Sequence, residues 1–117
     1  MATQDWQDTS HSGLDVSQFI ERLTVVTIGV FDSGVGGLSI LDEALQQLPH
    51  HNYIYFADSA NAPYGDKPPQ WIAERSLQIC RYLMEQYCSA IVVACNTATA
   101  EAIATIRSTL DIPIIGV

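Results

Sequence analysis

The sequence contains few basic residues. Lys and Arg together occur five times in 117 residues, against 13 Asp and Glu, which gives a formal net charge of −8. The five are scattered along the chain rather than clustered: Arg22, Lys67, Arg75, Arg81 and Arg107. Binding to nucleic acid or to an anionic membrane surface needs a concentrated basic patch. The composition therefore disfavours nucleic-acid binding and attachment to anionic membranes.

Long apolar runs and a cysteine framework are also missing. No apolar stretch approaches the length of about 18 residues that a membrane span needs, and the N-terminus lacks the basic-then-apolar order of a secretory signal. The three cysteines, Cys80, Cys88 and Cys95, are odd in number and have no CxxC spacing. That pattern disfavours a disulfide framework or a zinc site. We therefore expect a cytoplasmic protein with reduced thiols, no bound metal and no membrane association.

The character of the sequence changes near residue 23. Residues 1–22 are polar and show no sustained periodicity, so we expect a flexible N-terminal extension. Four short, nearly continuous apolar runs follow, of the kind typical of strands covered on both faces: Val25–Phe31, Tyr53–Ala57, Ala90–Ala94 and Pro113–Val117. Apolar residues at three- and four-residue steps predict a helix in each interval. Residues 23–117 are therefore predicted to form an α/β domain, one doubly wound half-domain with a parallel sheet and helices on both faces.

Polar, glycine-rich or nucleophilic segments follow three of the predicted strands. They are "DSGVGGL" after the first, "DSANAPYGDK" after the second and "CNTAT" after the third. Ligands of open parallel sheets bind outside the carboxyl ends of the strands. We therefore expect the three segments to meet at one edge of the sheet.

Each of the first two segments has two interpretations. The glycines of "DSGVGGL" allow the start of a helix to receive an anion such as phosphate or carboxylate; alternatively, Asp32 or Ser33 caps a tight turn. In "APYGD", Tyr64 at a loop tip can offer its hydroxyl, and the neighbouring N–H groups can receive a carboxylate. The alternative there is an ordinary loop.

Cys95 follows the third predicted strand and precedes a helix. A thiol acts as a base or nucleophile only as the thiolate, and about 3% of a free thiol with a pKa of about 8.5 is ionised at pH 7. The N-terminus of a helix favours the anion, and Asn96 and Thr97 place donors beside it. Cys95 is therefore a candidate base or nucleophile, or else a small buried residue at a strand end. Cys80, on the apolar stripe of the preceding helix, and Cys88, near the end of that helix, are expected to be inert packing cysteines.

Three motifs together resemble one family. "IGVFDSGVGGLSIL", "YFADSANAPYG" and "VVACNTATA" are similar to the N-terminal half of bacterial glutamate racemases, in the aspartate/glutamate racemase superfamily. The similarity runs from about Thr27 to Val117. The resemblance implies interconversion of L- and D-glutamate without a cofactor, which supplies D-glutamate for peptidoglycan. It also implies glutamate as the small-molecule substrate and a homodimer in the full-length protein.

The resemblance also implies roles for individual residues. Family members use two cysteines on opposite faces of the substrate α-carbon, and Cys95 matches the one that acts on the D-enantiomer. Asp32 matches a catalytic position that assists this thiol. The positions that match substrate contacts are Asp32, Ser33, Tyr64, Gly65, Asn96 and Thr97.

One feature of the family is missing from this sequence. The second catalytic cysteine of the family lies in a Gly-Cys-Thr-His stretch, which does not occur in residues 1–117. Family members have two similar α/β domains with the active site between them. We therefore expect residues 23–117 to be an incomplete racemase, the first domain without the second, with little or no racemase activity by itself.

Other functions stay open on the residues alone. An Asp and glycines after a first strand also fit a phosphate-binding α/β enzyme, although the Walker pattern is missing and Ser39 breaks GxGxxG. A non-catalytic interaction module is the second alternative. A pyridoxal enzyme is disfavoured because the only lysine, Lys67, lies in a predicted loop. Metal catalysis is disfavoured because the histidines, His11, His50 and His51, are clear of the strand ends that carry motifs.

Overall fold

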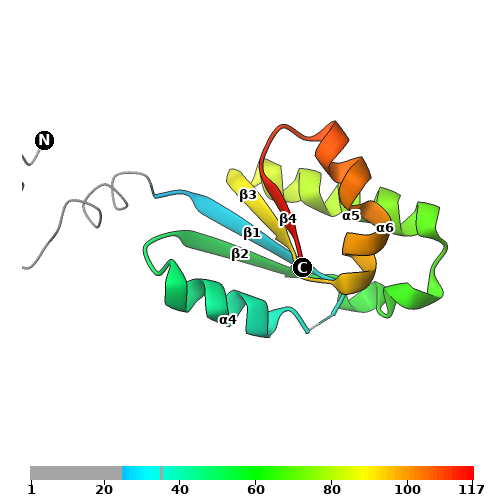
Figure 1. Ribbon diagram of the computed structural model, residues 1–117, viewed down its shortest axis with the longest axis horizontal. Helices are drawn as coiled ribbons and strands as arrows, with labels where there is room; N and C mark the ends of the chain where they lie inside the picture. Colours follow the sequence, from blue (N-terminus) through cyan, green and yellow to red (C-terminus); the bar gives the residue numbers. More distant parts are fainter. Residues whose placement is uncertain (1–24, 35) are drawn as a thin grey trace, which may run out of the picture.

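The structure, a computed structural model, describes residues 25–34 and 36–117 (Figure 1). The predicted extension, residues 1–22, lies outside the described residues. The elements, in chain order, are β1 (Thr27–Asp32), α4 (Leu38–Gln47), β2 (Asn52–Ala57), the short 3-10 helices η1 (Ser59–Asn61) and η2 (Tyr64–Asp66), α5 (Pro69–Glu85), β3 (Cys88–Val93), α6 (Asn96–Thr109) and β4 (Ile114–Gly116). In this part of the chain, no helix has the length and apolar character needed to cross a membrane.

The four strands form one parallel sheet in the order β2-β1-β3-β4. The connection from β1 to β2 runs toward one edge of the sheet, whereas those from β2 to β3 and from β3 to β4 run toward the other. Right-handed crossovers therefore place α4 on one face and both α5 and α6 on the opposite face, as Figure 1 shows. The predicted α/β fold with a parallel sheet and helices on both faces is confirmed.

The core lies between the sheet and the α5–α6 layer. Strands β1 and β3 contribute fully buried side chains, among them Phe31 and Ile91, and helix α5 contributes Ile79 and Leu83. Burying a side chain of this size stabilises the fold by about 1.5–3 kcal/mol. This layer holds β1 and β3 rigidly at the centre of the sheet.

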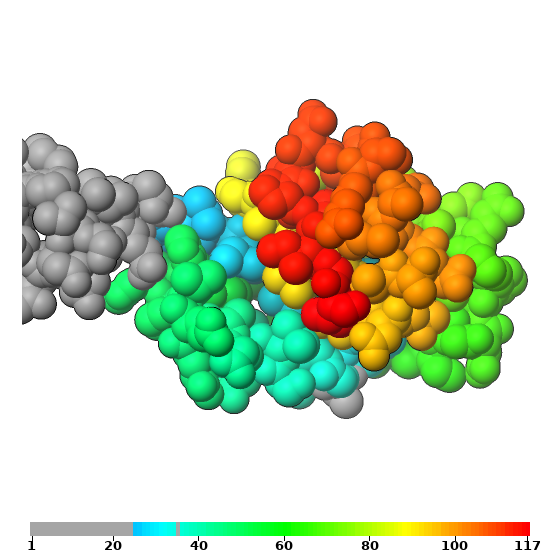
Figure 2. Space-filling view, viewed as in Figure 1, coloured from blue at the N-terminus to red at the C-terminus, as the bar shows by residue number. Residues whose placement is uncertain are grey.

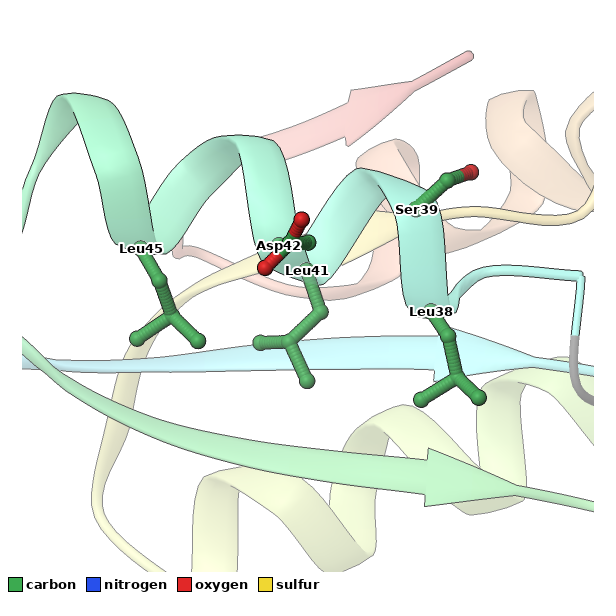
Figure 3. Close-up of a pocket in the computed structure, with 5 residues that line it drawn as sticks. All are labelled: Leu38, Ser39, Leu41, Asp42 and Leu45. Atoms are coloured by element: carbon green, nitrogen blue, oxygen red, sulfur yellow. The ribbon is translucent and has the colours of Figure 1, made fainter.

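Helix α4 is much less buried than the other two helices. None of its residues is buried, and Leu38 and Leu45 are 50% and 43% exposed. Figure 3 shows Leu38, Leu41 and Leu45 projecting from the same side of α4, where they line a hollow together with Ser39 and Asp42. The spacing of the leucines predicted the helix correctly. Their exposure follows because α4 is the one helix on this face in the described part of the chain.

Strands β2 and β4 are the edges of the described sheet. Strand β4 lies at the surface beside α6 (Figure 2), and Ile115 and Val117 are 54% and 45% exposed. The two central strands, β1 and β3, are the ones followed by Asp32 with Ser33 and by Cys95. The best-anchored part of the sheet therefore carries the candidate site.

Candidate functional site

The carboxyl ends of β1 and β3 lie side by side at the centre of the sheet. The chain leaves β1 toward β2 on one side and leaves β3 toward β4 on the other. Such a switch point creates a crevice in which ligands of open α/β sheets bind. Backbone bonds join the strand ends there, from the Ala94 N–H to the Phe31 carbonyl (2.7 Å) and from the Asp58 N–H to the Asp32 carbonyl (2.9 Å). The structure thus brings the three predicted segments to one edge.

Cys95 lies directly after β3, at the N-cap of α6. Its Sγ accepts a hydrogen bond from the Ala98 N–H (3.4 Å) and lies 3.3 Å from the Oγ of Ser33. The residue is 8% exposed. The peptide dipoles at the start of α6 point their positive ends toward this sulfur, which favours negative charge there. Ser33 and Cys95, 62 positions apart in the chain, are therefore brought together.

Asp32 ends β1 and is 4% exposed. Its carboxylate accepts hydrogen bonds from the N–H groups of Ser33 (2.8 Å) and Gly37 (2.6 Å). A Cβ on Gly37 would lie 3.0 Å from the Cβ atoms of both Asp32 and Ala94, so only glycine lets the start of α4 come this close. The interpretation in which Asp32 caps a tight turn is confirmed. Its negative charge already occupies the place that an external anion would take.

Tyr55, on β2, is a further partner of Asp32 that the sequence analysis did not predict. Its hydroxyl lies 3.5 Å from Asp32 Oδ2 and donates to the Gly34 carbonyl at 3.2 Å. Burial, followed by the negative charge of Asp32, raises the pKa of Tyr55. Tyr55 is therefore a protonated donor at neutral pH. The only indication in the sequence was that Tyr55 lies in a predicted strand. In the structure that strand pairs with β1, and Tyr55 lies opposite Val30.

Asn96 and Thr97 are the first two residues of α6. Asn96 is exposed and Thr97 is half-buried. Toward the described residues, neither side chain makes a hydrogen bond. Both predicted donors therefore stand next to Cys95 and are available to a ligand.

Tyr64 does not lie at a loop tip, so this expectation was wrong. It is 1% exposed, and its ring packs against Phe31 (centroids 6.1 Å apart) and edge-on against Trp71 (5.4 Å). Its hydroxyl donates to Asp58, and burial together with this bond raises the pKa of Tyr64. Tyr64 is therefore closed to a ligand, and within the pair only Gly65 is exposed. A Cβ on Gly65 would meet nothing within 4 Å, so the space beside it is open.

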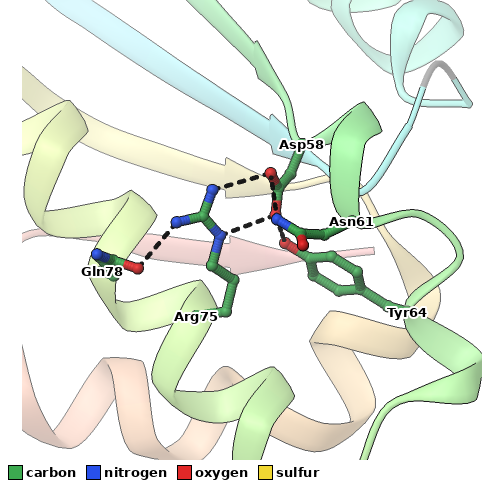
Figure 4. Close-up of polar contacts among 5 residues, drawn as sticks. All are labelled: Asp58, Asn61, Tyr64, Arg75 and Gln78. Carbon is green, nitrogen blue, oxygen red and sulfur yellow. Dashed lines mark hydrogen bonds and ion pairs between the residues drawn. The ribbon is translucent and has the colours of Figure 1, made fainter.

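Asp58 and Arg75 form an ion pair that the sequence analysis missed (Figure 4). The Arg75 Nε and Nη2 atoms each lie 2.9 Å from a different oxygen of Asp58, and Asn61 and Tyr64 also donate to that carboxylate. The Arg75 guanidinium, above all, lowers the pKa of Asp58 to about 2, and Asp58 in turn raises the pKa of Arg75. Asp58 is 5% exposed. Its place directly after β2 was the signal that could have indicated a buried partner.

The described residues suit proton chemistry on a small zwitterion. A thiol with a hydroxyl beside it lies next to an unpaired carboxylate, and the free donors of Asn96 and Thr97 adjoin the thiol. A carboxylate can receive an ammonium group, and amide or hydroxyl donors can bind a carboxylate. Among residues 25–34 and 36–117, no three His, Cys, Asp or Glu side chains are grouped as a metal site would require.

The matching protein family is described as Asp/Glu/Hydantoin racemase, and residues 28–117 match its model. Among curated proteins, the chain is 52% identical over 90 residues to the glutamate racemase of Ralstonia pickettii. The aligned region covers 77% of this chain and 32% of that protein. It is 56% identical over 90 residues to the glutamate racemase of Cupriavidus pinatubonensis, covering 77% and 33%. The chain thus spans about a third of the length of these relatives.

Solved structures agree with the sequence matches. Escherichia coli glutamate racemase in complex with L-glutamate and the activator UDP-MurNAc-Ala superposes with a TM-score of 0.77 at 44% identity, covering 80% of this chain and 35% of that one. Francisella tularensis glutamate racemase in complex with D-glutamate gives a TM-score of 0.73 at 40% identity, covering 78% and 35%. The likeness therefore includes both the fold and the sequence.

Proposed function

Because the chain belongs to the Asp/Glu/Hydantoin racemase family, we propose that it supplies one half of an active site that interconverts L- and D-glutamate. The contact between Ser33 and Cys95 at the switch point, beside the carboxylate of Asp32, carries this proposal. It places a thiol with a hydroxyl and a backbone N–H as neighbours where open α/β sheets bind their ligands. The names of the relatives supply the amino acid, since the site chemistry alone fits any small acidic amino acid.

The proposed reaction is a proton exchange at the α-carbon without a cofactor. The Cys95 thiolate removes the α-proton of D-glutamate and becomes a thiol, and the electron pair of the C–H bond delocalises into the α-carboxylate. A second thiol then delivers its proton to the opposite face of the α-carbon and becomes the thiolate. Cys80 and Cys88 cannot serve as that second thiol, because Cys80 lies within α5 and Cys88 lies at the opposite end of β3 from Cys95. The second thiol has to come from polypeptide other than residues 1–117.

The other residues of the site have distinct proposed roles. Asp32 receives the substrate ammonium and Ser33 holds the Cys95 thiol in position. Asn96, Thr97 and the backbone N–H of Gly65, which Tyr64 anchors, donate to the substrate carboxylates. Run in the reverse direction, from L- to D-glutamate, the reaction would supply D-glutamate for peptidoglycan synthesis. We further propose that the full-length protein acts in the cytoplasm, where its three unpaired thiols stay reduced, and that it is a homodimer.

The two rival functions make different demands on the site. A phosphate-binding enzyme needs free N–H groups at the start of α4, but the Asp32 carboxylate accepts from Gly37 and carries negative charge toward any anion there. A non-catalytic interaction module does not require the thiol of Cys95. The effect of replacing Cys95 therefore separates the proposed function from the second rival.

A chimera tests the proposal. Residues 28–117 replace the matching 90 residues of the Ralstonia pickettii glutamate racemase, and racemisation of L- and D-glutamate is followed by circular dichroism. We expect an active chimera, and a fall of about 10²- to 10⁴-fold in kcat for Cys95→Ala, the range for losing a positioned proton-transfer group.

Cys88→Ala is the matched control for that experiment. Cys88 lies at the opposite end of β3 from Cys95, so this variant should keep the activity of the chimera. A folded but inactive chimera, or a Cys95→Ala variant as active as its parent, would contradict the proposal. Residues 1–117 alone should show little or no racemisation, because they lack the second thiol.

A further inference from the structure

The loop between β2 and α5, residues 58–67, forms the third side of the candidate site. It begins with the bond from the Asp58 N–H to the Asp32 carbonyl, and its helix η2 lies against α6, the helix that starts beside Cys95. A Cβ on Gly34 would lie 4.0 Å from the Cβ of Ala62, so the loop also borders the turn after β1. Its placement therefore sets where the Tyr64–Gly65 backbone stands relative to the thiol.

One buried carboxylate organises this loop from within. Asp58 accepts from Asn61 Nδ2 (3.1 and 3.2 Å to its two oxygens) and from the Tyr64 hydroxyl, which are both residues of the loop. Two kinds of contact thereby fix Tyr64: its ring packs in the core, and its hydroxyl donates to Asp58. The backbone of residues 64 and 65 cannot shift without disturbing the carboxylate.

Arg75 ties that carboxylate to a rigid element outside the loop. Its planar fork bonds both oxygens of Asp58 at 2.9 Å, and its Nη1 donates to Gln78 on the same helix at 2.8 Å (Figure 4). A bidentate, charge-assisted pair fixes direction as well as distance. Helix α5 packs by its buried face against the core, so the fork transmits that rigidity to the loop.

We propose that Arg75 is a positioning residue for substrate binding: through Asp58 and Tyr64 it holds the exposed Gly65 backbone at the site, and so determines affinity for the substrate carboxylate rather than the rate of proton transfer. This inference rests on the proposed racemase function. Arg75 contacts none of the residues proposed to meet the reacting atoms, and the ion pair also removes the net charge of Asp58 from the vicinity of an anionic substrate.

The test compares Arg75→Ala and Arg75→Lys in the chimera defined above. Losing the fork should raise KM for glutamate about tenfold in Arg75→Ala with kcat nearly unchanged, because binding weakens equally in the ground and transition states. Arg75→Lys keeps the charge but not the bidentate geometry, so its KM should lie between those of the parent and Arg75→Ala. Arg81→Ala, an exposed arginine on the same helix, is the matched control and should behave as the parent.

The split between KM and kcat separates positioning from a merely structural role. A variant that only lowered the folded fraction would reduce apparent kcat and leave KM unchanged, since the molecules that stay folded bind normally. Protection of the buried Cys80 and Cys88 from iodoacetamide measures the folded fraction independently, because only unfolded molecules expose them. If Arg75→Ala is too unstable to assay, Arg75→Lys alone decides, by a KM raised about threefold.

Two failures are distinguishable. An inactive parent chimera refutes the proposed function. An active parent whose KM is unchanged in Arg75→Ala and Arg75→Lys, or whose kcat alone falls, refutes the positioning role of Arg75 and leaves the proposed function standing.

Discussion

Two buried carboxylates lie at the ends of neighbouring strands, Asp32 as the last residue of β1 and Asp58 directly after β2, and they are satisfied in different ways. Asp32 accepts from N–H groups one and five residues away, which belong to its own turn. Asp58 accepts from side chains, one of them an arginine 17 residues away on α5. Both are nearly inaccessible, at 4% and 5% exposure.

The two carboxylates therefore differ in whether their charge is available to a ligand. Arg75 compensates the charge of Asp58, so Asp58 is suited to holding the loop and offers nothing to a ligand. Among the described residues no cation pairs with Asp32, whose charge stays free for a bound ammonium group. Buried charge without a partner is costly in a purely structural role. This difference supports the proposed roles, in which the unpaired carboxylate meets the substrate and the paired carboxylate supports the loop beside it.

Removing the paired carboxylate should have the largest effect on stability. Asp58→Ala leaves the Arg75 guanidinium and the buried Tyr64 hydroxyl without their acceptor, so we expect it to lower the free energy of unfolding by about 3 kcal/mol in urea titrations. Asp32→Ala breaks no ion pair and should lower it by about 1–2 kcal/mol. Asp66→Ala, at an exposed position in the same loop, is the control. Equal losses at positions 58 and 66 would refute the comparison.

The paired carboxylate should also make stability depend on acid pH. The pKa of Asp58 is lowered to about 2 from 3.8, so its stabilisation is fully present above the unfolded pKa and is lost as pH falls through the folded pKa. The advantage of the parent over Asp58→Asn, about 2 kcal/mol near neutral pH, should therefore shrink steadily below about pH 4. Urea titrations of both proteins between pH 7 and pH 3 measure it. A constant difference over that range would show that the ion pair does not stabilise the fold.

The thiol at the candidate site should react differently from the two thiols elsewhere in the chain. Burial raises the pKa of Cys80 to about 12 and also raises that of Cys88, whereas Cys95 has polar partners at the start of a helix. In the native 117-residue chain at pH 7–8, iodoacetamide should modify Cys95 at least about tenfold faster than the other two. Peptide mass spectrometry reads the sites, and Cys95→Ser should abolish the fast reaction. If Cys88 reacted faster than Cys95, the accessible thiol would lie at the end of β3 opposite the candidate site, and the prediction would be wrong.

The smallest expected effect comes from a position remote from both carboxylates. Tyr87 has a φ of 66° and is 87% exposed. Glycine adopts this left-handed conformation without the steric penalty of a Cβ, so Tyr87→Gly should raise the free energy of unfolding by about 0.5–1 kcal/mol. The gain should add to the loss in Asp58→Ala, because distant sites are independent. A destabilised Tyr87→Gly would mean that the exposed ring contributes to folding.

The fold and half of the site were predictable because their signals are local. Continuous apolar runs located the strands, and the segments after them located Asp32, Ser33 and Cys95. Cys88 was assigned to a helix end but begins β3, because the turn before it has no glycine or proline and uses Tyr87 at positive φ instead.

The rest of the site depends on contacts that the sequence does not encode locally. Turn residues surround Tyr64, and nothing in "PYG" tells whether an aromatic ring points outward or into the core. From the sequence alone, Arg75 is simply a polar residue on the exposed side of a predicted helix. Its partner is identified only once helix and loop are folded together, so the Asp58–Arg75 pair could not be predicted from spacing.

The hydrogen-bond register of β1 against β3 has a consequence for how this site comes into being. Ser33 and Cys95 meet only after a parallel pairing that spans two intervening helices, α4 and α5, and the edge strand β2, and such long-range pairings form slowly in folding. Partly folded chains would keep their helices and yet have the thiol without its hydroxyl neighbour. A thiol that has its hydroxyl neighbour, and so reacts as the native one does, therefore reports that β1 and β3 have paired.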